Sequence, residues 1–224
     1  MDAILSIETS TSVCSVALHE NGNLLAVKEV FTPQSAAAQL ARMVEDVFDE
    51  AKTSKKELKA VAVSAGPGSY TGLRIGVATA KGICFGLNVP LISIDSLLVL
   101  ALHPSIPSGM DFLCPMIDAR RMEVYCSLLD TSFNVVETTQ AKVIDSSSFS
   151  NYLAKRSILF FGNGATKCRD ALSHPNAYFS EIAYTSAASM GNPAFDKFQT
   201  HQFESLALFE PNYLKEFVAK TKSK

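Results

Sequence analysis

The sequence predicts an α/β protein of two tandem lobes, because one order of elements occurs twice along the chain. In each half, three strands are followed by a helix, a strand and a second helix. The halves meet at residues 103–109, where proline, serine and glycine are typical of a connector. We therefore place one lobe at residues 1–104 and the other at residues 105–224, with a C-terminal segment able to pack back on the first lobe.

Three apolar runs open the first half and predict strands at residues 3–7, 13–18 and 24–30. Asn21 and Gly22 lie between the second and third runs, and Asn-Gly is the strongest short hairpin signal because both residues tolerate positive φ. The second and third strands should therefore pair antiparallel.

The rest of the first half alternates helices and strands. An apolar stripe predicts a helix over 35–52, and Ser54 to Glu57 has the spacing of a capping box. Further on we expect a strand at 60–63, a glycine-rich loop, a helix at 71–85 with Ser69 or Thr71 as its cap, a strand at 91–94 and a helix to about 102.

The second half repeats this order without sequence identity to the first. We expect strands at 113–117, 124–129 and 133–138, a short helix at 147–155, a strand at 158–161 and a helix at 165–172. A three-strand meander followed by helix, strand and helix is the plan of a ribonuclease-H-like lobe. Two such lobes around a cleft form the plan of the actin, hexokinase and Hsp70 superfamily, with mixed sheets flanked by helices.

The glycine-rich segment 64–76 is the most distinctive stretch of the chain. Its spacing fits neither the dinucleotide fingerprint Gly-x-Gly-x-x-Gly nor the Walker loop. The alternative is a structural turn leading into a closely packed helix. Gly72, Gly76 and Ala80 recur every four residues, share one helix face and would let another helix come close.

In the two-lobed plan, the turn after each lobe's first strand faces the cleft. Hydroxyls, backbone N–H groups and one carboxylate per lobe would suit a magnesium–nucleotide site, although ordinary hydrophilic turns have the same composition. The candidate nucleotide-binding residues are Glu8, Thr9, Ser10, Thr11, Asp118, Gly162 and Gly164.

Composition excludes several classes of protein. The net charge of −2 and the pI of about 6.1 argue against a broad nucleic-acid surface, which would be basic. The five cysteines never form Cys-x-x-Cys and sit mostly in apolar runs, as expected of reduced thiols in a cytosolic protein. No signal peptide is visible, and no apolar run reaches the roughly 18 residues of a membrane span. We expect a soluble, cytoplasmic protein with no membrane partner.

Several motifs together resemble one family, the bacterial TsaB proteins (older name YeaZ). They cover nearly the whole chain in the right order, and the glycine loop is the most specific of them. The motifs lie at residues 7–11, 14–18, 66–76, 81–82, 118–125, 162–165 and 210–214.

The resemblance implies a role in tRNA modification. In this family TsaB pairs with TsaD, which places a threonylcarbamoyl group on N6 of adenosine 37 in tRNAs that read ANN codons. TsaE, an ATPase, joins the complex, TsaC supplies the threonylcarbamoyl-adenylate, and isolated TsaB-like proteins form homodimers through first-lobe helices. The chain would then be a non-catalytic subunit that dimerises with TsaD and reaches tRNA only through the complex. It would require no cofactor, and its cleft would allow weak binding of ATP or ADP with Mg²⁺.

The surface that the resemblance implies for pairing lies on the helices 35–52 and 71–85. The expected partner-interface residues are Ala36, Leu40, Met43, Gly72, Leu73, Gly76 and Ala80. One departure concerns Glu8, because the family commonly has aspartate there, and the longer side chain weakens the case for a nucleotide.

Two enzymatic alternatives remain open at this stage. The first is a stand-alone nucleotide-dependent phosphotransferase of the actin-like superfamily. The second is a glycoprotease, the older label of the family, but His-Glu-x-x-His is absent and the four histidines show no metal-ligand spacing. The His-x-x-x-His pair that the resemblance attributes to TsaD is absent too, so we expect neither a catalytic residue nor a metal site.

Overall fold

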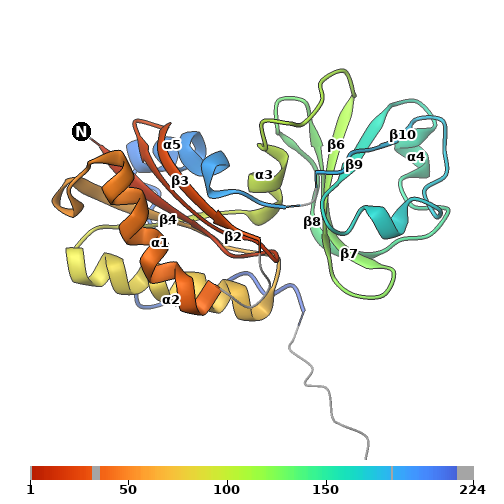
Figure 1. Ribbon diagram of the computed structural model, residues 1–224. Coiled ribbons are helices and arrows are strands. Elements are labelled where there is room, and N and C mark those ends of the chain that lie inside the picture. Colours follow the sequence, from red (N-terminus) through yellow and green to blue (C-terminus); the bar gives the residue numbers. More distant parts are fainter. Residues whose placement is uncertain (1, 32–35, 183, 216–224) are drawn as a thin grey trace, which may run out of the picture.

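Two five-stranded sheets organise the chain, one in each half, and Figure 1 shows them side by side with helix α3 between them. The computed structural model describes residues 2–31, 36–182 and 184–215, and leaves the side chains of residues 36 and 37 undescribed. The expected helix start at Ser35 lies outside the described residues.

The first sheet has the strand order β3-β2-β1-β4-β5. Its strands are β1 (Ala3–Glu8), β2 (Cys14–Glu20), β3 (Asn23–Val30), β4 (Leu58–Ser64) and β5 (Leu91–Ile94). The first three strands pair antiparallel, whereas β4 runs parallel to both β1 and β5. The predicted hairpin is confirmed, since Asn21 and Gly22 have φ values of 50° and 82°.

Helices cover both faces of this sheet (Figure 1). One face carries α1 (Ala36–Ala51) and α2 (Tyr70–Leu87); the other carries the 3₁₀ turn η3 (Ala187–Met190) and α5 (Gly191–Gln199). Strand β4 shows how alternate side chains pack against the helices on both faces of the sheet. Val61 and Val63 join the core under α1 and α2, while Ala60 and Ala62 join the core under α5. Such a strand reads as one continuous apolar run.

The second sheet has the order β10-β9-β6-β7-β8. Its strands are β6 (Phe112–Asp118), β7 (Glu123–Asp130), β8 (Val135–Val143), β9 (Ile158–Phe161) and β10 (Ala177–Phe179). Its outer face packs against α4 (Ser150–Leu153) and the 3₁₀ turn η2 (Thr166–Cys168). Its inner face packs against α3 (Ser96–Ala101), so the side chains of one short helix join the two lobes.

The predicted capping box and the predicted cap of α2 are confirmed. Ser54 and Glu57 form the capping box before β4, around the 3₁₀ turn η1 (Lys55–Glu57). Ser69 caps α2 by accepting a hydrogen bond from the N–H of Gly72, and Asp95 caps α3. Asn88 ends α2 in the left-handed conformation, after Gly82 and Gly86 have continued the helix.

Other predictions for the second half need correction. The helix expected at 147–155 shrinks to α4, because Phe149 has a φ of 61°, which no right-handed helix can accommodate. The helix expected at 165–172 is only the 3₁₀ turn η2, and the third strand runs to residue 143 rather than 138. Strand β10, the turn η3 and helix α5 are not predicted by the sequence pattern.

Residues 204–215, which we call the C-terminal strap, run back along the first lobe. Glu204 forms an antiparallel bridge with Leu91, and the N–H of Asn212 donates to the carbonyl of Ala65 at 2.6 Å. The strap then reaches the second lobe, where Lys215 pairs with Glu123. The boundary at residues 104 and 105 stays a prediction, while the strap, η3 and α5 all pack on the first sheet. None of the helices in the described residues has the length and apolar character needed to cross a bilayer.

Candidate functional site: a cleft between the lobes and an outward helix face

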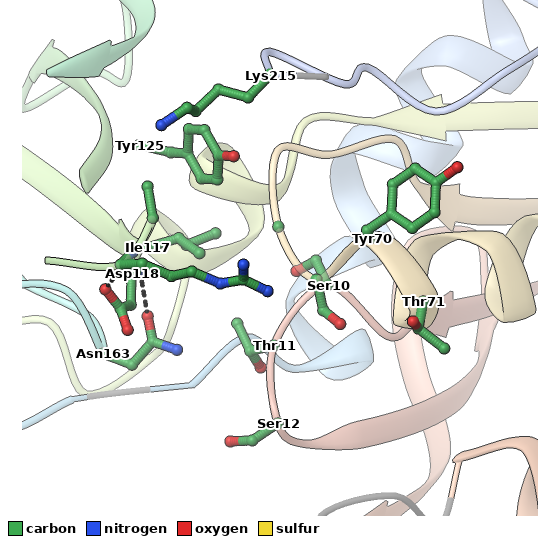
Figure 2. A pocket seen from close by; sticks show the side chains of 14 residues that line it. Ser10, Thr11, Ser12, Tyr70, Thr71, Ile117, Asp118, Tyr125, Asn163 and Lys215 are labelled. Carbon is green, nitrogen blue, oxygen red and sulfur yellow. Dashed lines mark hydrogen bonds between the residues drawn. The ribbon is translucent and has the colours of Figure 1, made fainter. Parts of the chain in front are cut away.

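A cavity of about 510 Å³ opens between the two lobes, and Figure 2 shows side chains from both lobes around it. The first lobe contributes the turn after β1 and the glycine-rich loop. The second lobe contributes the end of β6 and the turns beside it, and the strap contributes its last described residue. The lining residues are Ser10, Thr11, Ser12, Gly68, Ser69, Tyr70, Thr71, Ile117, Asp118, Ala119, Arg120, Tyr125, Asn163 and Lys215.

The glycine-rich loop packs directly on the first-lobe turn. The N–H of Ser69 donates to the carbonyl of Ser10 at 2.7 Å, and the hydroxyl of Thr9 donates to the carbonyl of Gly72 at 2.8 Å. A Cβ at Gly68 would lie 2.3 Å from the carbonyl oxygen of Ser10, and one at Gly72 would lie 2.1 Å from that of Thr9. The glycines are therefore required for a close approach within the first lobe.

Most residues expected at the partner interface lie inside the first lobe of the single chain. Leu40, Met43, Leu73, Gly76 and Ala80 are all buried by the chain's own first lobe. Gly72 is half-buried against Thr9, and the side chain of Ala36 lies outside the described residues. An interface on α1 and α2 stays a prediction, but buried side chains offer a partner no surface.

The face of α2 that points away from the first lobe carries exposed small residues beside an exposed aromatic side chain. These are the features that the sequence suggested for a partner interface on the opposite, buried face. The side chain of Phe85 is 83% exposed, and a Cβ at Gly82 or Gly86 would meet nothing within 4 Å. Ala78 is exposed on the same helix, and α1 packs alongside with Ala38 and Ala41 exposed. The sequence signal was present, since Gly82 and Phe85 are three residues apart on an otherwise core-forming helix.

Glu8 lies beneath the cleft and does not line it. Its side chain is fully buried, Oε1 accepts a hydrogen bond from the N–H of Ser10 at 2.5 Å, and Oε2 has no hydrogen-bond partner among the described residues. Burial raises the pKa of this carboxyl above its ordinary value, against the opposing effect of the hydrogen bonds from Ser10. Thr9 is buried beside it, whereas Ser10 and Thr11 reach the cavity.

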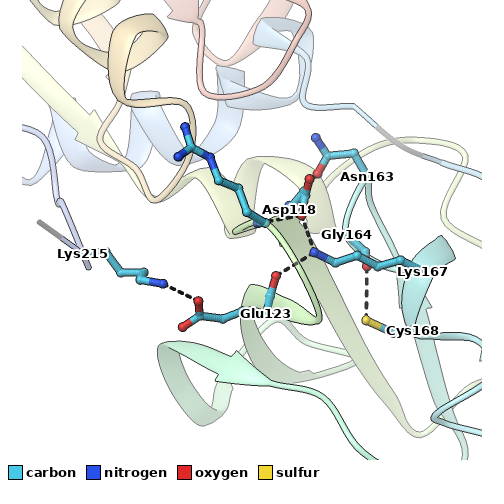
Figure 3. Close-up of polar contacts among 8 residues, drawn as sticks. Asp118, Glu123, Asn163, Gly164, Lys167, Cys168 and Lys215 are labelled. Atoms are coloured by element: carbon cyan, nitrogen blue, oxygen red, sulfur yellow. Dashed lines mark hydrogen bonds and ion pairs between the residues drawn. The ribbon is translucent and has the colours of Figure 1, made fainter. Parts of the chain in front are cut away.

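Asp118 lines the cavity from the second lobe, but its carboxylate is already engaged (Figure 3). Oδ1 pairs with the ammonium of Lys167 and also accepts a hydrogen bond from the N–H of Arg120 at 2.9 Å. Lys167 in turn donates to the carbonyl of Glu123 at 2.7 Å. The carboxylate is therefore neutralised by the protein itself.

The two glycines predicted at the second-lobe site allow the backbone to pack closely against strand β6. Gly162 has a φ of 102° and would place a Cβ 2.2 Å from the carbonyl oxygen of Met116, while a Cβ at Gly164 would lie 2.9 Å from the carbonyl carbon of Ile117. Asn163 between them lines the cavity and accepts a hydrogen bond from the N–H of Asp118 at 2.9 Å. Asn163, Arg120 and Lys215 were not among the predicted site residues.

The donor set does not fit the magnesium ion of a nucleotide complex. Magnesium needs carboxylate oxygens that point into the site, usually with several waters. Glu8 is buried away from the cavity, and Asp118 is paired with a lysine. Within residues 2–31, 36–182 and 184–215, no three His, Cys, Asp or Glu side chains gather as a metal-ligand set.

Comparison with known proteins first defines the class. Two ribonuclease-H-like sheets joined across a cleft are the actin-like fold, and component A of (R)-2-hydroxyglutaryl-CoA dehydratase from Acidaminococcus fermentans shares it, with a TM-score of 0.50 at 12% identity over 89% of this chain and 100% of that one. The fold prediction is confirmed. A much closer structure is YeaZ from Pseudomonas aeruginosa, with a TM-score of 0.82 at 26% identity over 96% of this chain and all of that one.

The chain belongs to the TsaD family, described as tRNA N6-adenosine threonylcarbamoyltransferase, whose model matches residues 31–222. Among curated proteins, it is similar to the tRNA threonylcarbamoyladenosine biosynthesis protein TsaB of Escherichia coli K12, at 37% identity over 122 residues. The TsaB of Bacillus subtilis 168 is 30% identical over 134 residues, which are 60% of this chain and 58% of that one. The match to the E. coli protein covers 54% of this chain and 52% of that one, so the chain spans about half the length of that relative. The resemblance to TsaB and YeaZ is confirmed.

Proposed function

We propose that this protein is a non-catalytic subunit of the assembly that makes threonylcarbamoyladenosine in tRNA, acting in the cytoplasm. The family membership and the names of the TsaB relatives support the pathway. In this proposal the chain pairs with a TsaD-type catalytic subunit, TsaE joins the pair, and tRNA is contacted through the complex.

The outward face of α2 is the observation that carries the proposal. A phenylalanine that is 83% exposed lies beside two glycines with open space above them. An exposed aromatic side chain is the kind of anchor that dominates protein interfaces, and glycines beside it let a partner helix approach closely. Paired helices α1 and α2 would meet an equivalent helix pair of the partner, or of a second copy when the protein is alone.

The non-catalytic part of the proposal rests on the side chains that the sequence contains. Where the resemblance places a His-x-x-x-His pair in TsaD, this chain has Gln34 to Leu40, with no histidine. The cleft offers one carboxylate, Asp118, and Lys167 neutralises it. These residues supply neither metal ligands nor an available base, so the chemistry would belong to the partner.

Reconstitution of the modification tests the pathway. Purified TsaC, TsaD and TsaE from the same organism are incubated with an ANN-reading tRNA and the substrates of TsaC, with and without this protein. Mass spectrometry of the digested tRNA should show threonylcarbamoyladenosine only when the protein is present. Equal modification in its absence would refute the proposal.

A pair of surface variants tests the mode of action. Phe85→Asp places a charge on the proposed face and should weaken pairing with TsaD by more than about tenfold, with a matching loss of modification. Val135→Asp is the control, because Val135 is 61% exposed on β8 in the other lobe. Both variants should keep the native circular dichroism, and equal pairing by the two would rule out the α2 face as the contact surface.

A further inference from the structure

Helix α3 is shared between two hydrophobic cores, one in each lobe (Figure 1). Val99 lies in the first-lobe core, with side chains of β4 and β5. Leu97, Leu100 and Ala101 lie in the other core, with side chains of β6, β7 and β9 from the second sheet. All four side chains of α3 are at most 1% exposed. Rotation of one lobe against the other would therefore pull the helix out of one core and expose apolar side chains to water.

Close contacts fix α3 to both lobes. On the first-lobe side, the N–H of Ser96 donates to the carbonyl of Gly66 at 3.0 Å, and the hydroxyl of Ser96 accepts from the N–H of Gly66 at 3.1 Å. On the second-lobe side, a Cβ at Gly162 would lie 2.7 Å from Cδ2 of Leu100, so the helix packs directly on the turn after β9. Interiors packed this closely deform little, which leaves the helix no room to slide along either lobe.

The chain crosses between the lobes a second time after β10, and hydrogen bonds fix this crossing as well. On the second-lobe side, the N–H of Gly162 donates to the carbonyl of Ile182 at 2.6 Å. On the first-lobe side, the buried hydroxyl of Thr185 lies 3.2 Å from that of Thr11, in the turn after β1. The two lobes are therefore joined at a second place in addition to α3.

We propose that α3 locks the two lobes at one separation, so that the protein is a single rigid body whose cleft neither opens nor closes. The cavity of about 510 Å³ then keeps its volume, and the outward face of α2 keeps one position relative to the second lobe. A partner that contacts both lobes would meet a preformed surface, which lowers the conformational cost of binding. The lock depends on contacts within this chain alone, so it holds whether or not the proposed pairing with TsaD is correct.

Pulsed electron paramagnetic resonance of the full chain tests the lock, because it measures the distribution of distances between two spin labels. Asp196→Cys on α5 and Val143→Cys on β8 place exposed labels on the two lobes, while the five native cysteines are buried. Asp49→Cys with Asp196→Cys is the reference pair, since both positions lie in the first lobe on opposite faces of its sheet. An excess of unlabelled protein removes distances between copies. The interlobe distribution should have one peak, no wider than the reference, and a second peak or a clearly broader one would overturn the proposal.

The salt dependence of the same measurement distinguishes α3 from the C-terminal strap. Lys215 of the strap pairs with Glu123 of the second lobe in a solvent-exposed ion pair, which high salt screens. If α3 sets the separation, the interlobe distribution should be the same in about 0.1 M and about 1 M sodium chloride. A distribution that shifts or broadens at high salt would assign the restraint to the strap and contradict the role of α3.

Leu100→Ala and Val99→Ala form a matched pair on α3, because both side chains are fully buried but lie in different cores. Both variants should lower the stability of the protein. Leu100→Ala should also broaden the interlobe distribution by about twofold or more, since it leaves a cavity beside Gly162 into which the helix can shift. Val99→Ala should leave the distribution unchanged. The milder Leu100→Val serves if the alanine variant loses its native circular dichroism, and an unchanged distribution in the Leu100 variant that folds would refute the lock.

Calorimetry of the natural chain gives a readout that needs no variant. Locked lobes should unfold in one transition, with equal calorimetric and van't Hoff enthalpies, because neither core can melt without the helix that it shares. Two separate transitions would show that the lobes are independent and would overturn the proposal.

Discussion

Thr9 and Gly76 meet where no larger residue fits, since a Cβ at position 76 would lie 2.3 Å from Oγ1 of Thr9. That hydroxyl is held in place because it donates to the carbonyl of Gly72 at 2.8 Å. We expect Gly76→Ala to lower the free energy of unfolding by about 1–3 kcal/mol, as overpacking outweighs the gain in helix propensity. Urea denaturation followed by circular dichroism measures the change.

Gly82→Ala is the matched control on the same helix. Nothing lies within 4 Å of the Cβ that it adds, so the gain in helix propensity acts alone. The free energy of unfolding should rise by about 0.5–1 kcal/mol. Changes of the same sign in the two variants would contradict the close packing of Thr9 on α2.

The contrast between these glycines shows how far the sequence predicts the site. Spacing predicted the close approach of another helix at Gly72, Gly76 and Ala80, and the structure has a close approach at Gly72 and Gly76. Spacing could not tell that the approaching group is the turn at Thr9, because this contact joins residues more than 60 positions apart. Only the tertiary fold shows that Gly82 and Phe85 lie on a face of the helix that stays exposed.

The fold shows the same contrast between local features, which the sequence predicts, and long-range contacts, which it does not. The hairpin at Asn21 and the cap at Ser69 were predictable because each depends on neighbours within a few residues. Helix α5 was missed because Gly191, Asn192 and Pro193 at its start are poor helix formers. It is held by tertiary packing, with Gly191 so close to the hairpin that a Cβ would lie 2.3 Å from the carbonyl oxygen of Gly22. Arg120 lines the cleft because it lies in a turn with left-handed backbone at residues 120 and 121, and no local sequence pattern predicts that turn.

The C-terminal strap should contribute to stability through an aromatic contact. The rings of Tyr70 and Tyr213 have centroids 4.8 Å apart, beside the hydrogen bond from Asn212 to Ala65. Tyr213→Ala should lower the free energy of unfolding by about 1 kcal/mol or more, and a double-mutant cycle with Tyr70→Ala should show a coupling of about 0.5–1.5 kcal/mol. Leu208→Ala on the same strap should change little, because Leu208 is 81% exposed. An equal loss at Leu208, or no coupling, would argue that the ring contact is not stabilising.

The thiols of the first lobe should be unreactive in the folded protein. Burial raises the pKa of Cys14 and of Cys84 to about 11 in each case, with Glu8 adding to the effect at Cys14. At pH 8 only about one thiol in a thousand would be ionised, and the thiolate is the reactive form. Labelling with iodoacetamide, followed by mass spectrometry of the peptides, should be at least about a hundredfold slower in buffer than in urea. Rapid native-state labelling at either cysteine would contradict this burial.

Glu8 should make the protein less stable as pH rises. Burial raises the pKa of its carboxyl in the folded chain above the value in the unfolded chain, so the folded state binds the proton more tightly. Its stabilising contribution is then fully present below the unfolded pKa, near 4.5, and is lost as pH rises through the higher folded pKa. Glu8→Gln keeps the size of the side chain and an acceptor for the N–H of Ser10 but carries no charge.

The variant should therefore be more stable than the natural chain at pH 7, and the difference should shrink towards pH 4. Urea denaturation at several pH values measures both curves, and Glu57→Gln is a matched control, because the carboxyl of Glu57 lies in an exposed capping box. An advantage of Glu8→Gln that grows as the pH falls would reverse the sign of the linkage. It would show that the ionised carboxylate, held by the N–H of Ser10, is the favoured form in the fold.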